Sequence, residues 1–237
     1  MNERLRYRIA YGVLGIGEAQ LSIEGMFGDA AAGPLLRATG SGQGAILGFG
    51  RLQDRVDTAF DPHLLASRRW TSQRTDSDGP GVIRDVSDQA RPGELRLTRE
   101  REGAPAARQR ARMPGPTFDP VGFLLRVRAA PPSAGAGPQV LQVLDGQALW
   151  RVSLSNTGPE SLADAGADVP PVPAIRIQGR AEPIQYSGAP DEGGDRTPRD
   201  FVLWLSDDAA RVPLRLEMPL PIGNLVVSLV EARRQAR

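Results

Sequence analysis

The chain has no cysteine, and its 237 residues include a single histidine, His63. Without thiols, the protein can form no disulfide bond, thiolate metal site or thiol nucleophile. A transition-metal site would then depend on carboxylates alone, and no carboxylate cluster has the required spacing. We therefore expect no metal and no cofactor, and we interpret His63, in the turn-like Asp61-Pro62-His63, as a loop residue.

Lysine is absent as well, so every basic side chain is an arginine. An all-arginine set would suit an anion-binding surface, because a guanidinium group can donate two parallel hydrogen bonds to a carboxylate or phosphate. The codon bias of a GC-rich genome is the preferred explanation, and the many Ala, Gly and Pro residues support it. A net charge of only +1 produces no overall positive potential that would attract nucleic acid. With only 5% aromatic residues, the chain also has few side chains on which bases could stack. We expect no nucleic-acid partner.

Long apolar runs are missing too. No segment approaches the roughly 20 apolar residues of a membrane helix, so we expect no transmembrane segment. The chain enters a strand-like pattern directly after Met1, without the basic segment and apolar core of a signal peptide. Two locations stay open: the periplasm or outer membrane, with an export signal not present in this chain, or the cytoplasm.

Glycine and proline are abundant, with 27 and 21 residues, which favours many short strands joined by turns. Apolar and polar residues alternate with the period of two that is typical of half-buried strands. The sequence predicts twelve to fourteen strands, no internal repeat and no domain boundary, hence one β-rich domain over residues 1–237. The expected strands are residues 5–11, 19–23, 35–39, 52–58, 64–75, 82–86, 94–101, 140–144, 148–154, 174–179 and three more within 201–233.

One helix is predicted, over residues 120–128. Asp119 is a suitable N-cap, Pro120 fits the first helical position, and Val121, Phe123 and Leu124 begin an apolar stripe. The segment 42–50 is expected to be a short helical or bent crossing because its apolar residues lie between glycines. Polar or irregular composition predicts loops at 103–116, 129–138, 164–173 and 189–198.

Motifs for catalysis are few. No Gly-x-Ser-x-Gly elbow and no Rossmann glycine pattern is present. Adjacent aspartates at 207 and 208 are interpreted as hairpin formers, because Asp hydrogen-bonds its own backbone in turns. A carboxylate-dependent hydrolase would most plausibly use Asp54, Asp57 or Asp119 in a cleft.

Large apolar residues give the clearest candidate site. Trp70, Trp150 and Trp204 lie on expected strands, and Phe123 and Leu124 lie on the helix. If a curved sheet wraps the helix, these five side chains converge on one concave space. That space is either a filled core or an open cleft that binds an acyl chain or another apolar ligand.

Four segments resemble a known bacterial family, domain-of-unknown-function family 3108. They are LRYRIAYGVLGIGEAQLSI (5–23), DRVDTAFDP (54–62), FDPVGFLLRVR (118–128) and WLSDDAARVPLRLEMPLPIGNLVVSLV (204–230). Members are mostly predicted exported envelope proteins without an established activity, so the resemblance implies location and fold but no catalytic residue. The implied fold is similar to the half-barrel of Lol-type lipoprotein carriers, a curved antiparallel sheet around a helix.

Together these observations predict a mainly β, half-barrel-like antiparallel sheet with one main helix packed on or inside it. The first functional hypothesis is a non-catalytic envelope protein that binds lipid or another apolar ligand in the concave face. The second is a structural or protein-interaction module of the periplasm or outer membrane that docks an envelope protein through sheet edges or arginine faces. The hydrolase comes last.

Overall fold

The computed structural model describes residues 2–27, 35–46, 50–63, 65–76, 81–91, 93–113, 115–146, 148–163, 171–186, 197–220 and 223–235. These residues form fifteen strands and one helix. No helix among them is both long and apolar enough to cross a membrane. The elements are β1 (Asn2–Tyr11), β2 (Leu14–Phe27), β3 (Leu35–Ile46), β4 (Gly50–Asp61), β5 (Ala66–Asp76), β6 (Gly81–Arg91), β7 (Glu94–Arg101), β8 (Ala107–Arg112), β9 (Thr117–Phe118), α1 (Pro120–Ala129), β10 (Gln139–Asp145), β11 (Ala148–Leu162), β12 (Val172–Ile184), β13 (Arg199–Ser206), β14 (Pro213–Leu220) and β15 (Gly223–Gln235).

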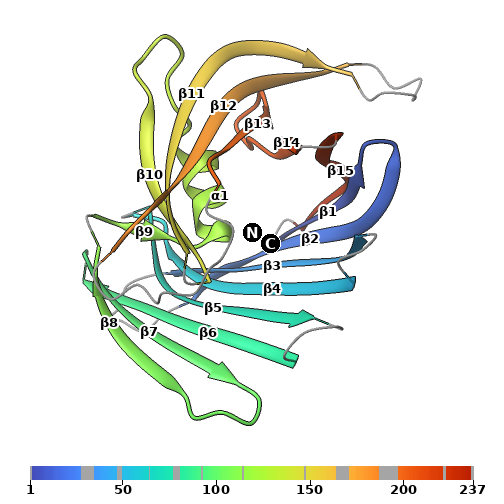
Figure 1. Cartoon of the computed structure of the whole chain (residues 1–237). Helices are drawn as coiled ribbons and strands as arrows, with labels where there is room; N and C mark the ends of the chain where they lie inside the picture. The colour runs from blue at the N-terminus through green and yellow to red at the C-terminus, as the bar shows by residue number, and fades with distance from the viewer. Residues whose placement is uncertain are drawn as a thin grey trace.

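All fifteen strands belong to one sheet, in the order β8-β7-β6-β5-β4-β3-β2-β1-β15-β14-β13-β12-β11-β10-β9. Neighbours pair in antiparallel fashion except β9 and β10, which are parallel. The sheet curls around α1 without closing into a continuous ladder (Figure 1). This arrangement confirms the predicted fold, a mainly β half-barrel with one helix inside its curve.

The two faces of the sheet differ in chemistry, as strand β1 illustrates. Leu5 and Tyr7 are buried in the main core, whereas the arginines that alternate with them are exposed. The same core contains residues of α1, so the face that carries Leu5 is called the inner face and the opposite one the outer face. Because successive strand residues point to opposite sides, this alternation assigns a face to each position in register.

The two ends of the sheet overlap. A second apolar cluster joins Trp70 of β5 and Leu95 of β7 to Leu144 of β10 and Leu149 of β11. Leu144 and Leu149 are paired in register and alternate with Val143, which belongs to the main core. The outer face of the β10–β11 hairpin therefore packs on the inner face of β5–β8. Side-chain packing, and not a backbone ladder, brings the two ends together.

Two predicted non-strand segments are wrong. Residues 42–46, expected to be a helical or bent crossing, continue strand β3, because its glycines face either a close neighbour or open space and need no turn. Residues 107–112, expected to be loop, form the edge strand β8. The inward-facing residues of β8 are Ala107, Gln109 and Ala111, two small residues and a polar one, so the segment lacks the strong apolar alternation that marks a strand.

The remaining elements follow the sequence more closely. The helix, the hairpin at Asp145-Gly146 and the three closing strands are confirmed, with fifteen strands in place of twelve to fourteen. The loop expected at 164–173 is shorter at its end, because β12 begins at Val172. Residues 164–170, and most of the loop expected at 189–198, lie outside the described residues.

Candidate functional site

The N-terminus of α1 is fixed by the buried carboxylate of Asp119, which is fully inaccessible to solvent. One carboxylate oxygen accepts hydrogen bonds from the backbone N–H groups of Val121 and Gly122, at 2.9 and 3.0 Å. The other accepts from the hydroxyl groups of Thr58 and Ser67, at 2.8 and 2.7 Å. Burial raises the pKa of Asp119, and these four hydrogen bonds act in the opposite direction. The predicted helix cap thus also ties α1 to β4 and β5.

The first turn of α1 packs unusually close to the sheet because glycine occupies two of the contact positions. A Cβ atom at Gly122 would lie 2.0 Å from the Ser67 hydroxyl oxygen, and one at Gly40 would lie 2.6 Å from a methyl group of Val121. Both distances are far below ordinary contact, so these positions require glycine. They explain why the Phe-Asp-Pro-Val-Gly segment has this composition.

The C-terminus of α1 is held by a buried ion pair. Arg128 donates to the Glu3 carboxylate at 2.6 Å and to the Ala210 carbonyl at 3.1 Å, and Arg234 donates to the second Glu3 oxygen at 2.8 Å. Burial alone would raise the pKa of Glu3, but the two guanidinium groups outweigh it and hold the pKa below its ordinary value. The helix is therefore fastened at both ends across the inner face.

Beyond α1, the inner face presents apolar side chains that are only partly buried. Leu216 and Met218 of β14 and Val227 and Leu229 of β15 pack against the main core yet remain half-exposed. Leu216 and Val227 are direct cross-strand partners, so the four side chains form one continuous surface. We call these four residues the apolar wall.

Opposite elements add aromatic side chains to the same face. Phe123 and Leu124 of α1 and Trp150 of β11 pack against the main core and are likewise half-exposed. These three predicted site residues therefore share the inner face with the apolar wall. The sequence did not single out the wall, although alternation along β14 and β15 would have indicated an apolar face there.

Gly42 of β3 marks unfilled space on the inner face. Gly40 faces Val121 of the helix, so Gly42, two residues further along the strand, faces the same side. A Cβ atom built at Gly42 would meet no heavy atom of the described residues within 4 Å. The inner surface is thus packed where α1 lies and open at Gly42.

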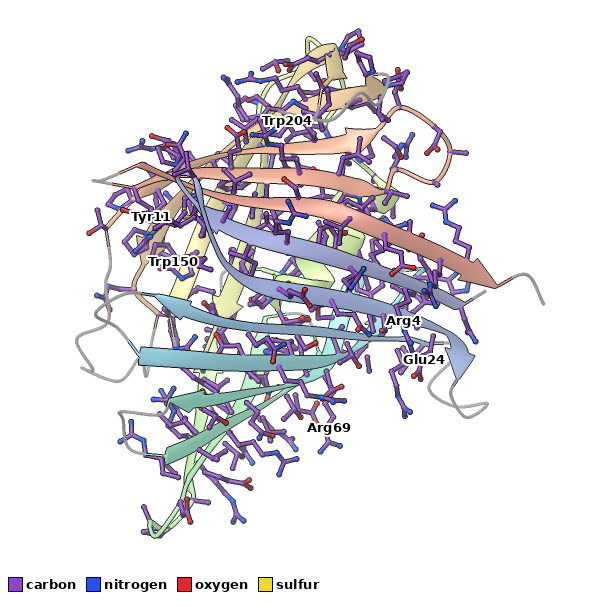
Figure 2. All side chains as sticks on the ribbon, turned by 90° about the vertical axis from the view of Figure 1, so that its right-hand side faces the viewer. Arg4, Tyr11, Glu24, Arg69, Trp150 and Trp204 are labelled. Atoms are coloured by element: carbon purple, nitrogen blue, oxygen red, sulfur yellow. The ribbon has the colours of Figure 1, made fainter. Side chains whose placement is uncertain are left out.

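Two of the five predicted site residues lie elsewhere. Trp70 is 2% exposed and fills the second apolar cluster, between β5 and the β10–β11 hairpin. Trp204 lies on the outer face, because it alternates with the core residues Leu203 and Leu205 (Figure 2). The expected convergence of all five side chains on one concave space does not occur.

The surroundings of Trp204 are polar. Its indole N–H donates to the Glu160 carboxylate at 3.1 Å, and the guanidinium groups of Arg176 and Arg215 lie over the ring, each 5.9 Å from its centre. Cation–π contacts of this kind shield an aromatic ring on a sheet surface. Trp204 therefore belongs to an outer-face ladder and does not face the interior.

The three carboxylates considered for catalysis are separated. Asp119 is enclosed at the helix N-terminus, and Asp54 forms an ion pair with Arg74 at 3.2 Å. Asp57 lies on the outer face, where a hydrogen bond from Arg55 and a second one from Thr39 hold its pKa below the ordinary value. Within the described residues, no three His, Asp or Glu side chains are grouped to hold a metal ion.

Two predicted turn residues are confirmed in their local role. Asp208 accepts hydrogen bonds from the Ser206 hydroxyl and from the N–H groups of Ala210 and Arg211, at 2.8, 2.9 and 3.0 Å. These bonds, the Ser206 one foremost, lower the pKa of Asp208. His63 is an exposed turn residue whose N–H donates to Asp61.

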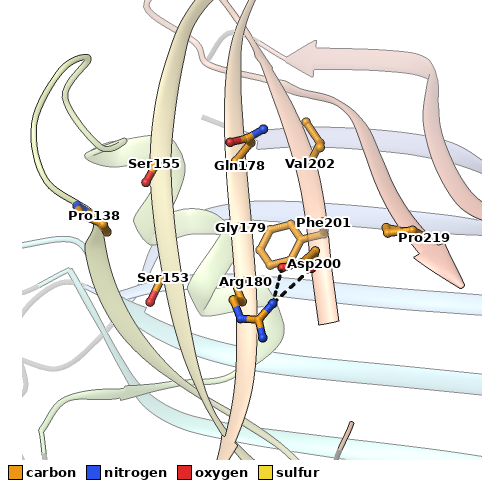
Figure 3. Close-up of a pocket in the computed structure, with 10 residues that line it drawn as sticks. All are labelled: Pro138, Ser153, Ser155, Gln178, Gly179, Arg180, Asp200, Phe201, Val202 and Pro219. Carbon is orange, nitrogen blue, oxygen red and sulfur yellow. Dashed lines mark hydrogen bonds and ion pairs between the residues drawn. The ribbon is translucent and has the colours of Figure 1, made fainter. Parts of the chain in front are cut away.

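The described residues include two grooves on the outer face. The larger, of about 440 Å³, crosses β11–β13 and contains the Arg180–Asp200 ion pair at 3.0 Å (Figure 3). Its polar side chains alternate along the strands with core residues, and the Phe201 ring lies against Gly179. The smaller, of about 290 Å³, crosses β1–β4 and is lined by polar side chains such as Gln20, Ser41 and Gln43. Both grooves are open to solvent; the smaller one has a mainly polar lining, whereas the larger one also exposes apolar residues such as Pro138, Val202 and Pro219.

Three solved structures match the chain to different degrees. A β-barrel-like protein of domain of unknown function DUF1849 from Brucella abortus is 10% identical, covers 99% of this chain and 98% of its own, and has a TM-score of 0.60. LprF from Mycobacterium bovis is 11% identical, covers 99% and 87%, and has a TM-score of 0.31. A protein described as a "putative lipoprotein" from Parabacteroides distasonis is 7% identical, covers 98% and 95%, and has a TM-score of 0.36.

Of these, the Brucella protein shows the fold, and no activity is transferred at such low identity. No curated protein matches the chain. The model of the family described as "Protein of unknown function (DUF3108)" matches residues 6–230, in agreement with the segments that carried the resemblance. The chain therefore belongs to the DUF3108 family.

Proposed function

We propose that the protein binds an apolar ligand, such as the acyl chain of a lipid, on the inner face beside α1. The observation that carries the proposal is the open space at Gly42, on a face whose apolar wall stays half-exposed. Apolar surface left in contact with water is unfavourable by about 25 cal/mol per Å². A ligand that covers the wall removes this cost.

An acyl chain suits the geometry of the wall. Leu216, Met218, Val227 and Leu229 come from two adjacent strands and pack against the main core, as Phe123 of α1 does. Each methylene group that moves from water into such surroundings contributes about 0.8 kcal/mol. Methionine adapts to irregular ligand surfaces because its side chain is flexible and polarisable. The binding affinity would therefore depend more on the length of the acyl chain than on the chemistry of the lipid head group.

The proposal is for binding without catalysis. The separated positions of Asp54, Asp57 and Asp119 support this, since each is engaged by its own partners and none faces another. A mechanism that used two of these carboxylates as general acid and general base would need both within hydrogen-bond reach of one substrate. We also propose the bacterial envelope as the location, because the family resemblance described above implies an exported envelope protein. Fractionation of cells that express the native gene tests the location.

The binding proposal is tested by filling the open space. Gly42→Leu places a side chain where a Cβ atom meets nothing within 4 Å, so the fold should tolerate it while the ligand loses room. Titration with a fluorescent palmitoyl probe should show at least tenfold weaker binding. Ser41→Leu, which adds the same side chain to the outer face one residue away, is the matched control and should bind like the unmodified protein.

Two results would contradict the proposal. Equal binding by both variants would move the ligand away from the inner face, and no saturable binding by the unmodified protein would remove the ligand altogether. Native mass spectrometry of the protein extracted from bacterial membranes supplies an independent readout. A co-purifying lipid that is lost in Gly42→Leu and retained in Ser41→Leu is the expected result.

A further inference from the structure

Several exposed arginines of the outer face are neutralised by a neighbouring carboxylate. Arg55 pairs with Asp57 at 2.8 Å, and Arg84 pairs with Glu100 at 3.0 Å. Other exposed arginines make no ion pair with a described residue: Arg4 and Arg8 lie on β1 and Arg151 lies on β11, whereas five more lie together at one end of the sheet. We call these five residues the arginine patch. Its five members are exposed and make no ion pair with any described residue: Arg69 of β5, Arg96 of β7, and Arg108, Arg110 and Arg112 of β8 (Figure 2, with Arg69 labelled).

Register places the patch on one face. Arg96 pairs across the ladder with Arg110, and on its other side with Asp88, which in turn pairs with Arg69. These positions alternate with the core residues Leu95 and Leu97, so their side chains point outward. With strands about 4.8 Å apart, the row spans roughly 14 Å from β5 to β8. It carries a strong local excess of positive charge.

The patch contains an arrangement that costs stability. Arg96 and Arg110 are direct cross-strand partners, and like charges directly opposite each other are destabilising. Asp88 and Glu94 are the two carboxylates in register with the five guanidinium groups, so the repulsion is only partly offset. A bound anion would relieve it. Guanidinium groups are well suited to phosphate because their planar forks donate two hydrogen bonds at once.

We propose that the arginine patch docks the protein on the surface of an anionic phospholipid bilayer. The five charges are spread over the broad face of four strands, which matches a planar array of phosphates. The outer-face side chains between them include Thr71, Val86 and Thr98 and offer no aromatic platform for nucleic-acid bases. The patch lies at the free edge of the sheet, where β8 has a single neighbour, so a flat surface can approach it.

Vesicle flotation tests the proposal. The protein should bind vesicles of phosphatidylcholine with 30% phosphatidylglycerol at low salt and should not bind pure phosphatidylcholine vesicles. A juxtamembrane basic residue contributes about 1 kcal/mol, or roughly fivefold in partitioning. The triple variant Arg108→Gln, Arg110→Gln, Arg112→Gln should therefore lose on the order of 100-fold. A higher salt concentration should also weaken the binding of the unmodified protein to anionic vesicles, because salt screens the charges.

A charge-matched variant separates the patch from net charge. Arg84→Gln, Arg180→Gln, Arg233→Gln removes three arginines that are already paired with carboxylates, and it should keep vesicle binding. Equal loss in both triple variants, or equal binding to neutral vesicles, would overturn the proposal. Tighter binding to a duplex DNA oligonucleotide than to vesicles would assign the patch to nucleic acid. Thermal unfolding of each variant checks that it is folded.

The docking proposal is independent of the proposed ligand site. Gly42→Leu leaves the outer face unchanged, so it should bind anionic vesicles like the unmodified protein even if it no longer binds the acyl probe. Loss of vesicle binding in Gly42→Leu would mean that the interior, and not the arginine patch, contacts the bilayer. That result would overturn the assignment of the patch.

Discussion

Asp119 is the residue whose surroundings are most unusual, because a carboxylate without a charged partner is fully buried. Since burial raises its pKa, the folded state holds the proton more tightly than the unfolded chain does. The stability that results is fully present below the unfolded pKa, near 4, and is lost as the pH rises through the folded pKa. In Asp119→Asn, the cap retains a side-chain oxygen and this pH dependence disappears.

The measurement is urea unfolding of both proteins between pH 4 and 8. The free energy of unfolding of the unmodified protein should fall relative to that of Asp119→Asn by up to about 1.4 kcal/mol per pH unit within the titration range. Asp57→Asn is the control with the opposite pH dependence. Because the pKa of Asp57 is lowered in the folded state, its contribution to the free energy of unfolding is lost as the pH falls. Parallel pH profiles for unmodified protein and Asp119→Asn would contradict the assignment.

Single residues show where sequence reasoning reaches its limit. The Asp-Pro pair predicted the helix cap, but the hydroxyl partners Thr58 and Ser67 lie 61 and 52 residues away in the chain, and no local pattern indicates them. Trp204 was placed on the wrong face because its strand is apolar at every position from Phe201 to Leu205. Alternation carries no information in such a run.

At the scale of elements, the seating of α1 depends on the absence of a side chain at Gly122. A methyl group there would lie 2.0 Å from the Ser67 hydroxyl oxygen and 2.7 Å from the Asp119 carboxylate. Gly122→Ala should therefore destabilise the protein by about 1–3 kcal/mol, despite the better helix propensity of alanine. Chemical denaturation monitored by far-UV circular dichroism measures the change.

A second substitution identifies the cause. Ser67→Ala removes the hydroxyl group that the new methyl group would strike, at the cost of two buried hydrogen bonds, one donated to the Asp119 carboxylate and one accepted from the Asp119 N–H. If steric conflict dominates, the double variant should be less destabilised than the sum of the two single variants, by about 1 kcal/mol or more. Simple additivity would show that the effect of Gly122→Ala arises within the helix itself.

A helix or hairpin could be predicted from the sequence wherever residues close together in the chain determine its conformation. The helix had both a cap and a proline, and the hairpin at Asp145-Gly146 had the turn dipeptide that such connections favour. Strand β8 was missed because an edge strand with one covered side shows little apolar alternation. The prediction ended strand β3 too early because its glycines resemble a turn signal. These glycines are explained by tertiary structure: Gly40 makes room for Val121, and Gly42 faces open space.

At the scale of the whole molecule, the overlap of the sheet ends could not be read from local patterns. Trp70 and Leu144 come from strands far apart in the chain, and nothing near either residue indicates the other. One signal was present: the hairpin is apolar on both faces, at Val143 and Leu144 and again at Leu149 and Trp150. Strands that are apolar on both faces are covered on both. The same geometry leaves the apolar wall open, because the overlap occupies a different part of the inner face.

The overlap yields a prediction with an internal control in one strand. Leu144 is fully buried and Val140 is 55% exposed, and both lie on the outer face of β10. Leu144→Ala should cost about 2–5 kcal/mol, whereas Val140→Ala should cost less than about 0.5 kcal/mol. Hydrogen exchange adds the spatial test: β7 and β8, which are held by this packing, should exchange faster in Leu144→Ala. Because β13 and β14 are held by the main core, their protection should change less, and a uniform loss of protection across the sheet would mean that the overlap is not a separate unit of stability.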